Sequence, residues 1–221
     1  MIVEDGLQKA WWCGHNAGGD GVYYSEGPVA EDTWSKPKLV LAADVPWEVT
    51  HACDPSVIRG DFTVDGDDWS YLMYYGAADL SSQNTKLGMA FSNNGTEWKK
   101  YGDAPLLVEP GMQYDYGVGM PGLFTVDGKP HVAYFDTGRN SAMLIREVNA
   151  DGTLAERIDM LPMSGGDTFA DLAFSEAEGR WYVATKSQLP PTVTPPPTST
   201  VPSAATCSPP SGTTWVRSAS T

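Results

Sequence analysis

Basic residues are scarce in this sequence of 221 residues. It has 14 Lys and Arg against 28 Asp and Glu, so the formal net charge at pH 7 is −14. Proteins that bind nucleic acids or anionic membranes need a basic surface, so we expect neither kind of partner. The acidic residues are scattered along the chain. This balance suits a neutral or cationic partner, and it equally serves solubility alone.

Long apolar runs are absent as well. No stretch approaches the roughly 18–20 residues of a membrane-spanning helix. The opening residues, MIVEDGLQKA, have neither the basic head nor the apolar centre of a signal peptide. We therefore expect no membrane span and no signal peptide in this sequence.

Cysteine is rare and irregularly placed. Cys13, Cys53 and Cys207 are an odd number, at no spacing typical of metal ligands. For Cys13 and Cys53 the sequence favours two buried thiols, and a disulfide between them is the second interpretation. We expect no cofactor. Calcium at the acidic turn of residues 65–68 is the one alternative, but this turn lacks the spaced ligands of a dedicated calcium loop.

Apolar residues nowhere recur at the three- and four-residue spacing of an amphipathic helix. Short runs rich in aromatic and β-branched residues instead alternate with turns rich in Gly, Asn and Asp. Residues 51–76 show the plan most clearly, with a strand, an acidic turn at residues 65–68 and a second, aromatic strand. This order predicts a β-hairpin.

The hairpin is one copy of an internal repeat. Its second strand has counterparts about 50–60 residues apart, centred near Trp12, Met73, Ala133 and Val183. A repeat of about 40–50 residues with four short strands is typical of a β-propeller blade. Residues 1–187 are therefore predicted to form a truncated first blade, two complete blades and half of a fourth.

A second region follows at residues 188–221. Eight of the 17 prolines lie in residues 189–221, among many Thr and Ser and a single charged residue, Arg217. Such a composition cannot bury a core and favours an extended, disordered tail. A linker to a further module and an unstructured tail without a role are both open interpretations.

The repeated hairpin resembles the five-bladed β-propeller glycosidases of glycoside hydrolase family 43 and its relatives. The likeness rests on DPSVI at 54–58 and YLMYY at 71–75, with support from LGMAFS at 87–92, NGTEW at 94–98, GVGMP at 117–121, WWCG at 11–14 and YYS at 23–25. It extends over residues 1–187. The fold it implies is all-β, a five-bladed propeller that is incomplete here, with about three to four blades.

The resemblance also implies a catalytic arrangement. Three carboxylates would line the central funnel, each near the start of the innermost strand of a different blade: a general base, a general acid and an orienting residue. Asp54 matches the orienting residue, and Pro55 biases it toward extended backbone. Gly119 stands at the position where the family has its general acid, a Glu. The general base would lie upstream of Met1 or in the truncated first strand.

Further residues are candidates for contacts with a sugar substrate. They are Trp12, His51, Asp115, Tyr116 and Asp171. His51 lies beside Asp54 and contacts sugar hydroxyls or, alternatively, a loop backbone. Asp171 heads the fourth innermost strand and lines the funnel or belongs to a turn. For Asp54 itself, the alternative is a cap on the turn that precedes its strand.

Aromatic side chains have two interpretations. Trp11, Trp12, Tyr75 and Tyr116 suit stacking on sugar rings, but aromatics that alternate along strands more often pack between blades. Packing is therefore favoured as their role.

Two functions stay open. The first is a secreted glycosidase that hydrolyses arabinosyl or xylosyl side-chain bonds of polysaccharides, a substrate class that the resemblance alone implies. The second is a glycan-binding propeller without catalysis, or an inactive fragment, favoured by Gly119 at the acid position. An oligo- or polysaccharide is the expected partner of either a glycosidase or a glycan-binding propeller.

Overall fold

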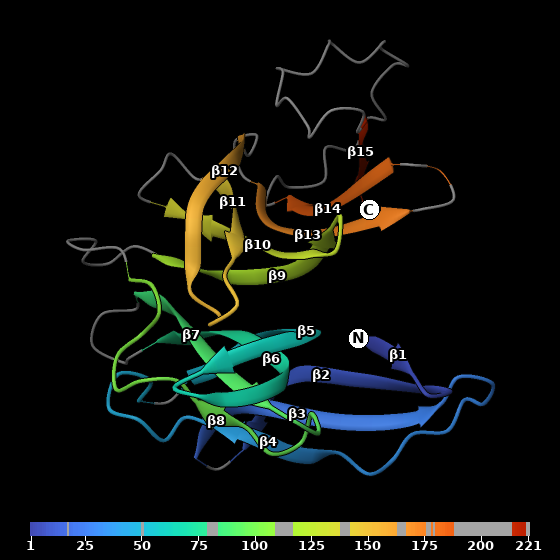
Figure 1. Ribbon diagram of the computed structural model, residues 1–221, viewed down its shortest axis with the longest axis vertical. Helices are drawn as coiled ribbons and strands as arrows, with labels where there is room; N and C mark the ends of the chain where they lie inside the picture. The colour runs from blue at the N-terminus through green and yellow to red at the C-terminus, as the bar shows by residue number, and fades with distance from the viewer. Residues whose placement is uncertain are drawn as a thin grey trace, which may run out of the picture.

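The computed structural model describes residues 1–16, 18–49, 51–78, 84–108, 117–137, 142–162, 167–175, 178, 180–187 and 214–219. These residues form strands, turns and bends without an α-helix, which confirms the all-β prediction. Accordingly, none of the described segments is a helix long and apolar enough to cross a membrane. Figure 1 shows the strands as successive small sheets, with β1–β8 below and β9–β15 above.

The first blade has four antiparallel strands. They are β1 (Ile2–Glu4), β2 (Leu7–Asn16), β3 (Gly19–Pro28) and β4 (Lys38–Ala42), paired in that order. Asp5 and Gly6 join β1 to β2 with φ values of 50° and 77°, the left-handed conformation that these residue types tolerate best in tight turns. The Gly-rich residues 18–21 indicate a turn by their composition, but β3 already begins at Gly19, so this segment is largely strand.

The second and third blades repeat this plan. The second has β5 (His51–Val64), β6 (Asp67–Ala78), β7 (Thr85–Ser92) and β8 (Lys99–Lys100). The third has β9 (Val118–Val126), β10 (Lys129–Asp136), β11 (Ala142–Val148) and β12 (Leu154–Pro162). All neighbouring strands within these blades are antiparallel, as the predicted hairpins require.

The fourth unit is built differently. Strands β13 (Asp167–Ser175) and β14 (Arg180–Ser187) form the predicted antiparallel pair. Beside them lies β15 (Thr214–Ala219), which is parallel to β14. The sequence does not predict β15, which lies in the proline-rich region. Residues 188–213 lie outside the described part, so their extended conformation stays a prediction.

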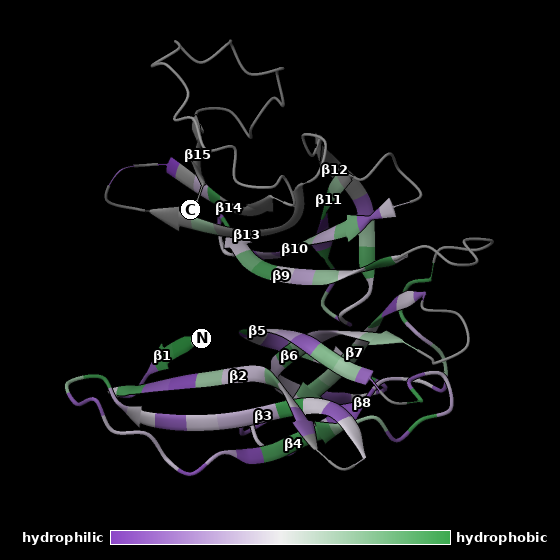
Figure 2. Ribbon diagram, turned by 180° about the vertical axis from the view of Figure 1, so that it is seen from behind, coloured by the Kyte–Doolittle hydropathy of each residue, from purple (hydrophilic) through white to green (hydrophobic). Residues whose placement is uncertain are grey.

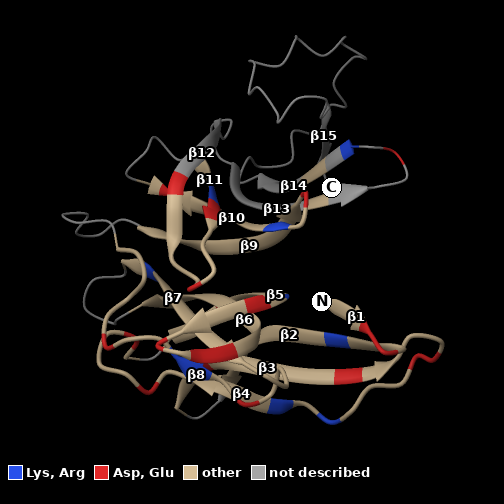
Figure 3. Ribbon diagram, viewed as in Figure 1, with Lys and Arg blue, Asp and Glu red and all other residues tan. Residues whose placement is uncertain are grey.

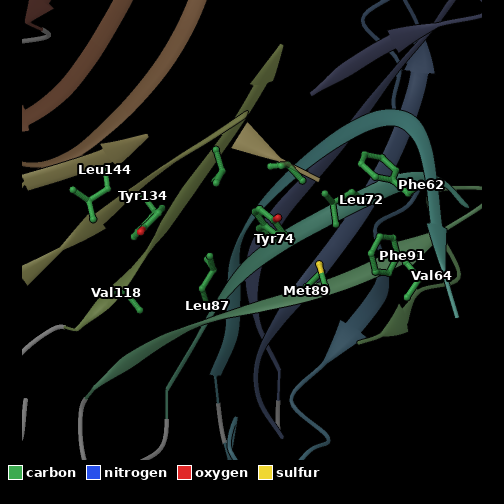
Figure 4. Packing of buried hydrophobic residues seen from close by; sticks show 12 residues of the cluster. Phe62, Val64, Leu72, Tyr74, Leu87, Met89, Phe91, Val118, Tyr134 and Leu144 are labelled. Carbon is green, nitrogen blue, oxygen red and sulfur yellow. The ribbon is translucent and has the colours of Figure 1, made fainter. Parts of the chain in front are cut away.

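The second blade is buried on both faces. Successive residues of β6 point to opposite faces, so Tyr74 packs toward the third blade and Tyr75 toward the first. Figure 4 shows Tyr74 with Leu87 of β7 and Val118 of the third blade. Burial on both faces explains why residues 71–75 are an unbroken apolar run, whereas Figure 2 shows polar and apolar residues interspersed along β2 and β3.

The first strands of the blades lie side by side. The Leu123 amide of β9 donates a hydrogen bond of 2.8 Å to Ser56 Oγ of β5. Three residues after Ser56 on β5, Arg59 Nη1 lies 2.6 Å from Glu4 Oε2 of β1, and Glu4 also accepts hydrogen bonds from Lys9 and Tyr71. These contacts hold successive innermost strands together. Elsewhere the acidic residues are spread over strands and loops (Figure 3), as expected from their scatter in the sequence.

Candidate functional site

The start of β5 is distorted by a β-bulge. The pairing of β5 with β6 shifts between Cys53, opposite Gly76, and Ser56, opposite Tyr74. Asp54 and Pro55 therefore share one partner position, and Asp54 has a φ of 49°. The prediction that Pro55 holds Asp54 extended is wrong. The bulge needs a residue outside the extended region, and Asp enters the left-handed region more readily than most residues.

The same bulge recurs at the start of β9. The pairing of β9 with β10 shifts between Gly119 and Gly122, and Met120, which precedes a proline, has a φ of 54°. By this geometry Met120 is the counterpart of Asp54, and Gly119 that of Cys53. Gly119 is buried and has no side chain, so neither residue places a carboxylate at this second strand start.

Asp54 lies in a cluster with two charged neighbours. His51 Nε2 is 3.9 Å from Asp54 Oδ2, and His51 Nδ1 is 2.8 Å from Asp20 Oδ2. The other oxygen of Asp20 is 2.8 Å from His15 Nδ1. The side chains of His51, Asp20 and Asp54 are 27%, 34% and 39% exposed. The cluster is therefore held in place by its own contacts and still accessible to a ligand.

These contacts shift two pKa values. The nearby Asp54 carboxylate raises the pKa of His51, burial lowers it, and the bond to Asp20 raises it again, with a net rise. At 3.9 Å, Asp54 acts as a neighbouring charge rather than a direct hydrogen-bond partner. His51 and then His15 lower the pKa of Asp20. His51 therefore keeps its positive charge to a higher pH than a free histidine.

Asp20 was not expected in this site. Its Gly-rich surroundings suggested a turn, yet it pairs with His51 in the single parallel contact between β3 and β5. Only the meeting of two blades places the two residues together, so local sequence carries no signal for it.

A disulfide joins Cys13 of β2 to Cys53, the residue before Asp54. Buried thiols, the favoured interpretation of the sequence, are therefore wrong, and the second interpretation holds. The two Cα atoms lie 4.9 Å apart, within the range that a disulfide spans. Because neighbouring blades create this proximity, the spacing of the cysteines in the sequence does not reveal it. The bridge ties the first blade to the start of β5.

The loop before β5 has a buried anchor that the sequence does not reveal. The Glu48 carboxylate is fully buried and accepts hydrogen bonds from Tyr75 Oη at 2.7 Å and Lys100 Nζ at 2.5 Å. The Glu48 carbonyl accepts a bond of 2.9 Å from the His51 amide. Glu48 thus connects the position of His51 to the core of the second blade.

The predicted aromatic residues divide between two faces. Trp11 packs toward the second blade against Tyr71 and Trp98, and Tyr75 is buried, which confirms packing between blades for both. Trp12 points to the other face of β2, where it lines a groove of about 510 Å³ together with Trp34. The structure therefore does not bring Trp12 to Asp54.

Three other predicted residues add no side chain to the described cluster. Asp115 and Tyr116 lie outside the described residues. Asp171 lies in β13 opposite Ala184, but its side chain is not among those described. Their roles stay predictions. In the acidic turn at residues 65–68, Thr63 donates a hydrogen bond to Asp68, and Lys99 forms an ion pair with Asp67. Both contacts suit a solvated turn, and calcium there stays an untested alternative.

Comparison with protein families and with curated proteins finds no match for this sequence. Comparison with solved structures does find matches. A thermostable family-43 glycoside hydrolase aligns with a TM-score of 0.55 and 19% identity over 82% of this chain. The chain has the propeller fold of family-43-type glycoside hydrolases.

Two further propellers support this assignment of the fold. An exo-β-1,3-galactanase from Clostridium thermocellum aligns over 86% of this chain, with a TM-score of 0.66 and 14% identity. An arabinanase from Bacillus subtilis aligns over 83%, with a TM-score of 0.58 and 17% identity. The propeller described here spans 60%, 42% and 62% of the length of the three structures, in the order given. The fold is therefore shared over part of each of these structures.

Proposed function

We propose that this propeller acts on glycans as a glycosidase-type protein, with Asp54 and His51 contacting sugar hydroxyls at the start of β5. One observation carries the proposal: the Asp54 carboxylate is fixed by a bulge at the start of an innermost strand yet stays 39% exposed. The glycoside hydrolases that share the fold include an arabinanase, an exo-1,5-α-L-arabinanase and an endo-1,4-β-xylanase. Arabinosyl and xylosyl glycans are thus the first substrates to test.

The expected contribution of Asp54 follows from its charge. A carboxylate that accepts hydrogen bonds from hydroxyl groups makes stronger bonds than a neutral acceptor does. Loss of one such bond costs about 1.5–3 kcal/mol, which corresponds to a roughly ten- to hundredfold loss of affinity. The positive charge of His51 partly balances Asp54, and its imidazole supplies a hydrogen-bond donor for sugar oxygens beside the Asp54 acceptor.

A specific observation supports a second candidate, glycan binding without hydrolysis. Hydrolysis needs two carboxyl groups on either side of the scissile bond. The strand start equivalent to that of Asp54 holds Gly119 and Met120 instead. The glycosidase therefore needs its second carboxylate from residues such as Asp115, whereas the binding protein needs none.

Calorimetric titration with arabino- and xylo-oligosaccharides tests the proposal, with a parallel assay for released sugar. We expect Asp54→Asn to bind about ten- to hundredfold more weakly than the parent chain. Asp127→Asn is the matched control, since Asp127 also has a positive φ but lies in the turn after β9. Sugar release by the parent chain identifies a glycosidase, and binding without release identifies a binding protein. Equal affinities of the two variants would end the role of Asp54.

A further inference from the structure

Four side chains with metal-binding atoms converge beside the sugar site. Asp20, His51 and Cys53 each offer one ligand atom, and these three atoms lie within 4.8 Å of one another. Cys13 is covalently bonded to Cys53, so its sulfur lies one bond away from the Cys53 sulfur. Two thiolates, an imidazole and a carboxylate are a ligand set that suits tetrahedral Zn²⁺.

We propose that Cys13, Cys53, His51 and Asp20 bind one Zn²⁺ when the disulfide is reduced. The same residues then have two alternative states, a disulfide in oxidising surroundings and a zinc site in reducing surroundings. This inference does not depend on sugar binding, because none of its steps involves a glycan.

The required movements are small. Zn–S bonds of about 2.3 Å at tetrahedral angles place two sulfurs about 3.8 Å apart. Cys13 and Cys53 have Cα atoms 4.9 Å apart, so rotation of the cysteine side chains reaches this separation without moving the strands. His51 Nδ1 and Asp20 Oδ2, now 2.8 Å apart, need to separate to about 3.3 Å around an ion bonded at about 2.0–2.1 Å.

The surroundings support a metal ion. Cys53 is fully buried, while the side chains of His51 and Asp20 are 27% and 34% exposed. An ion thus reaches the site from one side and is shielded on the other. His15 bonds the second oxygen of Asp20 at 2.8 Å, and such outer partners orient the ligands of zinc sites.

The chemistry of the change is balanced. A dithiol reductant transfers two electrons and two protons to the Cys13–Cys53 bond and itself becomes a disulfide. The two cysteines then carry thiols. Binding of a divalent cation releases both thiol protons to water, because thiolates are the metal ligands.

Cobalt is the probe for this site. The test uses the full chain with Cys207→Ser, so that Cys13 and Cys53 are its only thiols. We expect the reduced protein to bind one Co²⁺ with a thiolate-to-cobalt charge-transfer band, which Zn²⁺ then abolishes. The oxidised protein should show neither. A reduced protein that binds no cobalt, or binds it without this band, would overturn the proposal.

Variants identify the ligands. In the Cys207→Ser background, Cys13→Ser and His51→Gln should each weaken cobalt binding by more than the roughly 10–100-fold typical of an outer partner. The matched control is His131→Gln, since His131 lies in β10 and bonds the Lys129 carbonyl. Unchanged binding in Cys13→Ser or His51→Gln, or an equal loss in His131→Gln, would refute the assignment.

A thermal measurement covers the case in which reduction weakens the fold. A ligand that binds only the native state raises the melting temperature. Zn²⁺ should therefore raise the melting temperature of the reduced protein and leave that of the oxidised protein unchanged. An equal shift in both forms, or a shift in neither, would overturn the proposal.

Discussion

The buried carboxylate of Glu48 offers the sharpest test of how this fold is held together. The change is Glu48→Gln, which preserves the shape of the side chain and removes its charge. Glu48 accepts hydrogen bonds from Tyr75 Oη, Lys100 Nζ and the Asp44 amide, at 2.7, 2.5 and 3.0 Å. The Gln amide keeps one oxygen acceptor and turns its NH₂ group toward donors.

The magnitude follows from what remains after the change. Breaking a buried ion pair by removing one partner costs about 3–5 kcal/mol. Lys100 Nζ, however, also lies 2.5 Å from Asp44 Oδ1 and 2.5 Å from the Ala42 carbonyl, so its charge is not left unpaired. We therefore expect a loss of about 2–3 kcal/mol in the free energy of unfolding, near the value of a hydrogen bond to a charged group.

Urea unfolding followed by tryptophan fluorescence measures this loss. The matched control is Glu97→Gln, since Glu97 is exposed and its side chain accepts one long bond of 3.4 Å from Asn94. The control should stay within about 0.5 kcal/mol of the parent chain. In a double-mutant cycle with Lys100→Met, the two losses should add to more than the double variant shows. A loss below about 0.5 kcal/mol for Glu48→Gln would show that the buried Glu48 carboxylate does not stabilise the fold.

Three further predictions concern the rest of the fold. Burial raises the pKa of Glu4, but its hydrogen bonds to Lys9 and Tyr71 lower this pKa by more than burial raises it. The net pKa therefore lies below its ordinary value of 4.5. Its stabilisation is present above pH 4.5 and lost as the pH falls through the lowered pKa. Glu4→Gln should flatten this acid-side slope in unfolding measured against pH. Ser56→Ala removes the acceptor of the Leu123 amide, which should cost about 1–3 kcal/mol and speed exchange of that amide proton. Trp12 and Trp34 are 36% and 43% exposed on one blade face, so we expect self-association by light scattering, reduced in Trp12→Ser. A monodisperse monomer would contradict this last expectation.

The strands of the blades could be predicted from the sequence because their signals are local. The Asp-Gly pair at residues 65–66 indicates a hairpin turn, and this turn occurs with the φ values that such a pair tolerates. The aromatic run at residues 71–75 marked a strand, and its burial on both faces explains why it lacks alternation. The runs of apolar residues and the turn residues between them were therefore sufficient to predict these strands.

The candidate site could be predicted only in part. The resemblance to the propeller glycosidases implied Asp54 as a funnel carboxylate, and His51 was a candidate because it lies at the same strand start. The structure places their closest ion-pair atoms 3.9 Å apart, and their role in sugar binding stays a prediction. Asp20 and the Cys13–Cys53 bridge depend on how one blade meets the next, and a chain read locally carries no such information. The positive φ of Asp54 was missed because the preference of residues before proline is for extended backbone, and the bulge overrides it.

The proposed function depends on the binding of a glycan at the start of β5. Imidazole signals in nuclear magnetic resonance report on it directly, because His51 lies beside Asp54 and His131 lies in the third blade. On addition of a xylo- or arabino-oligosaccharide, we expect a saturable shift of the His51 ring signals and none for His131. Binding detected by calorimetry that leaves the His51 signals unmoved would contradict it.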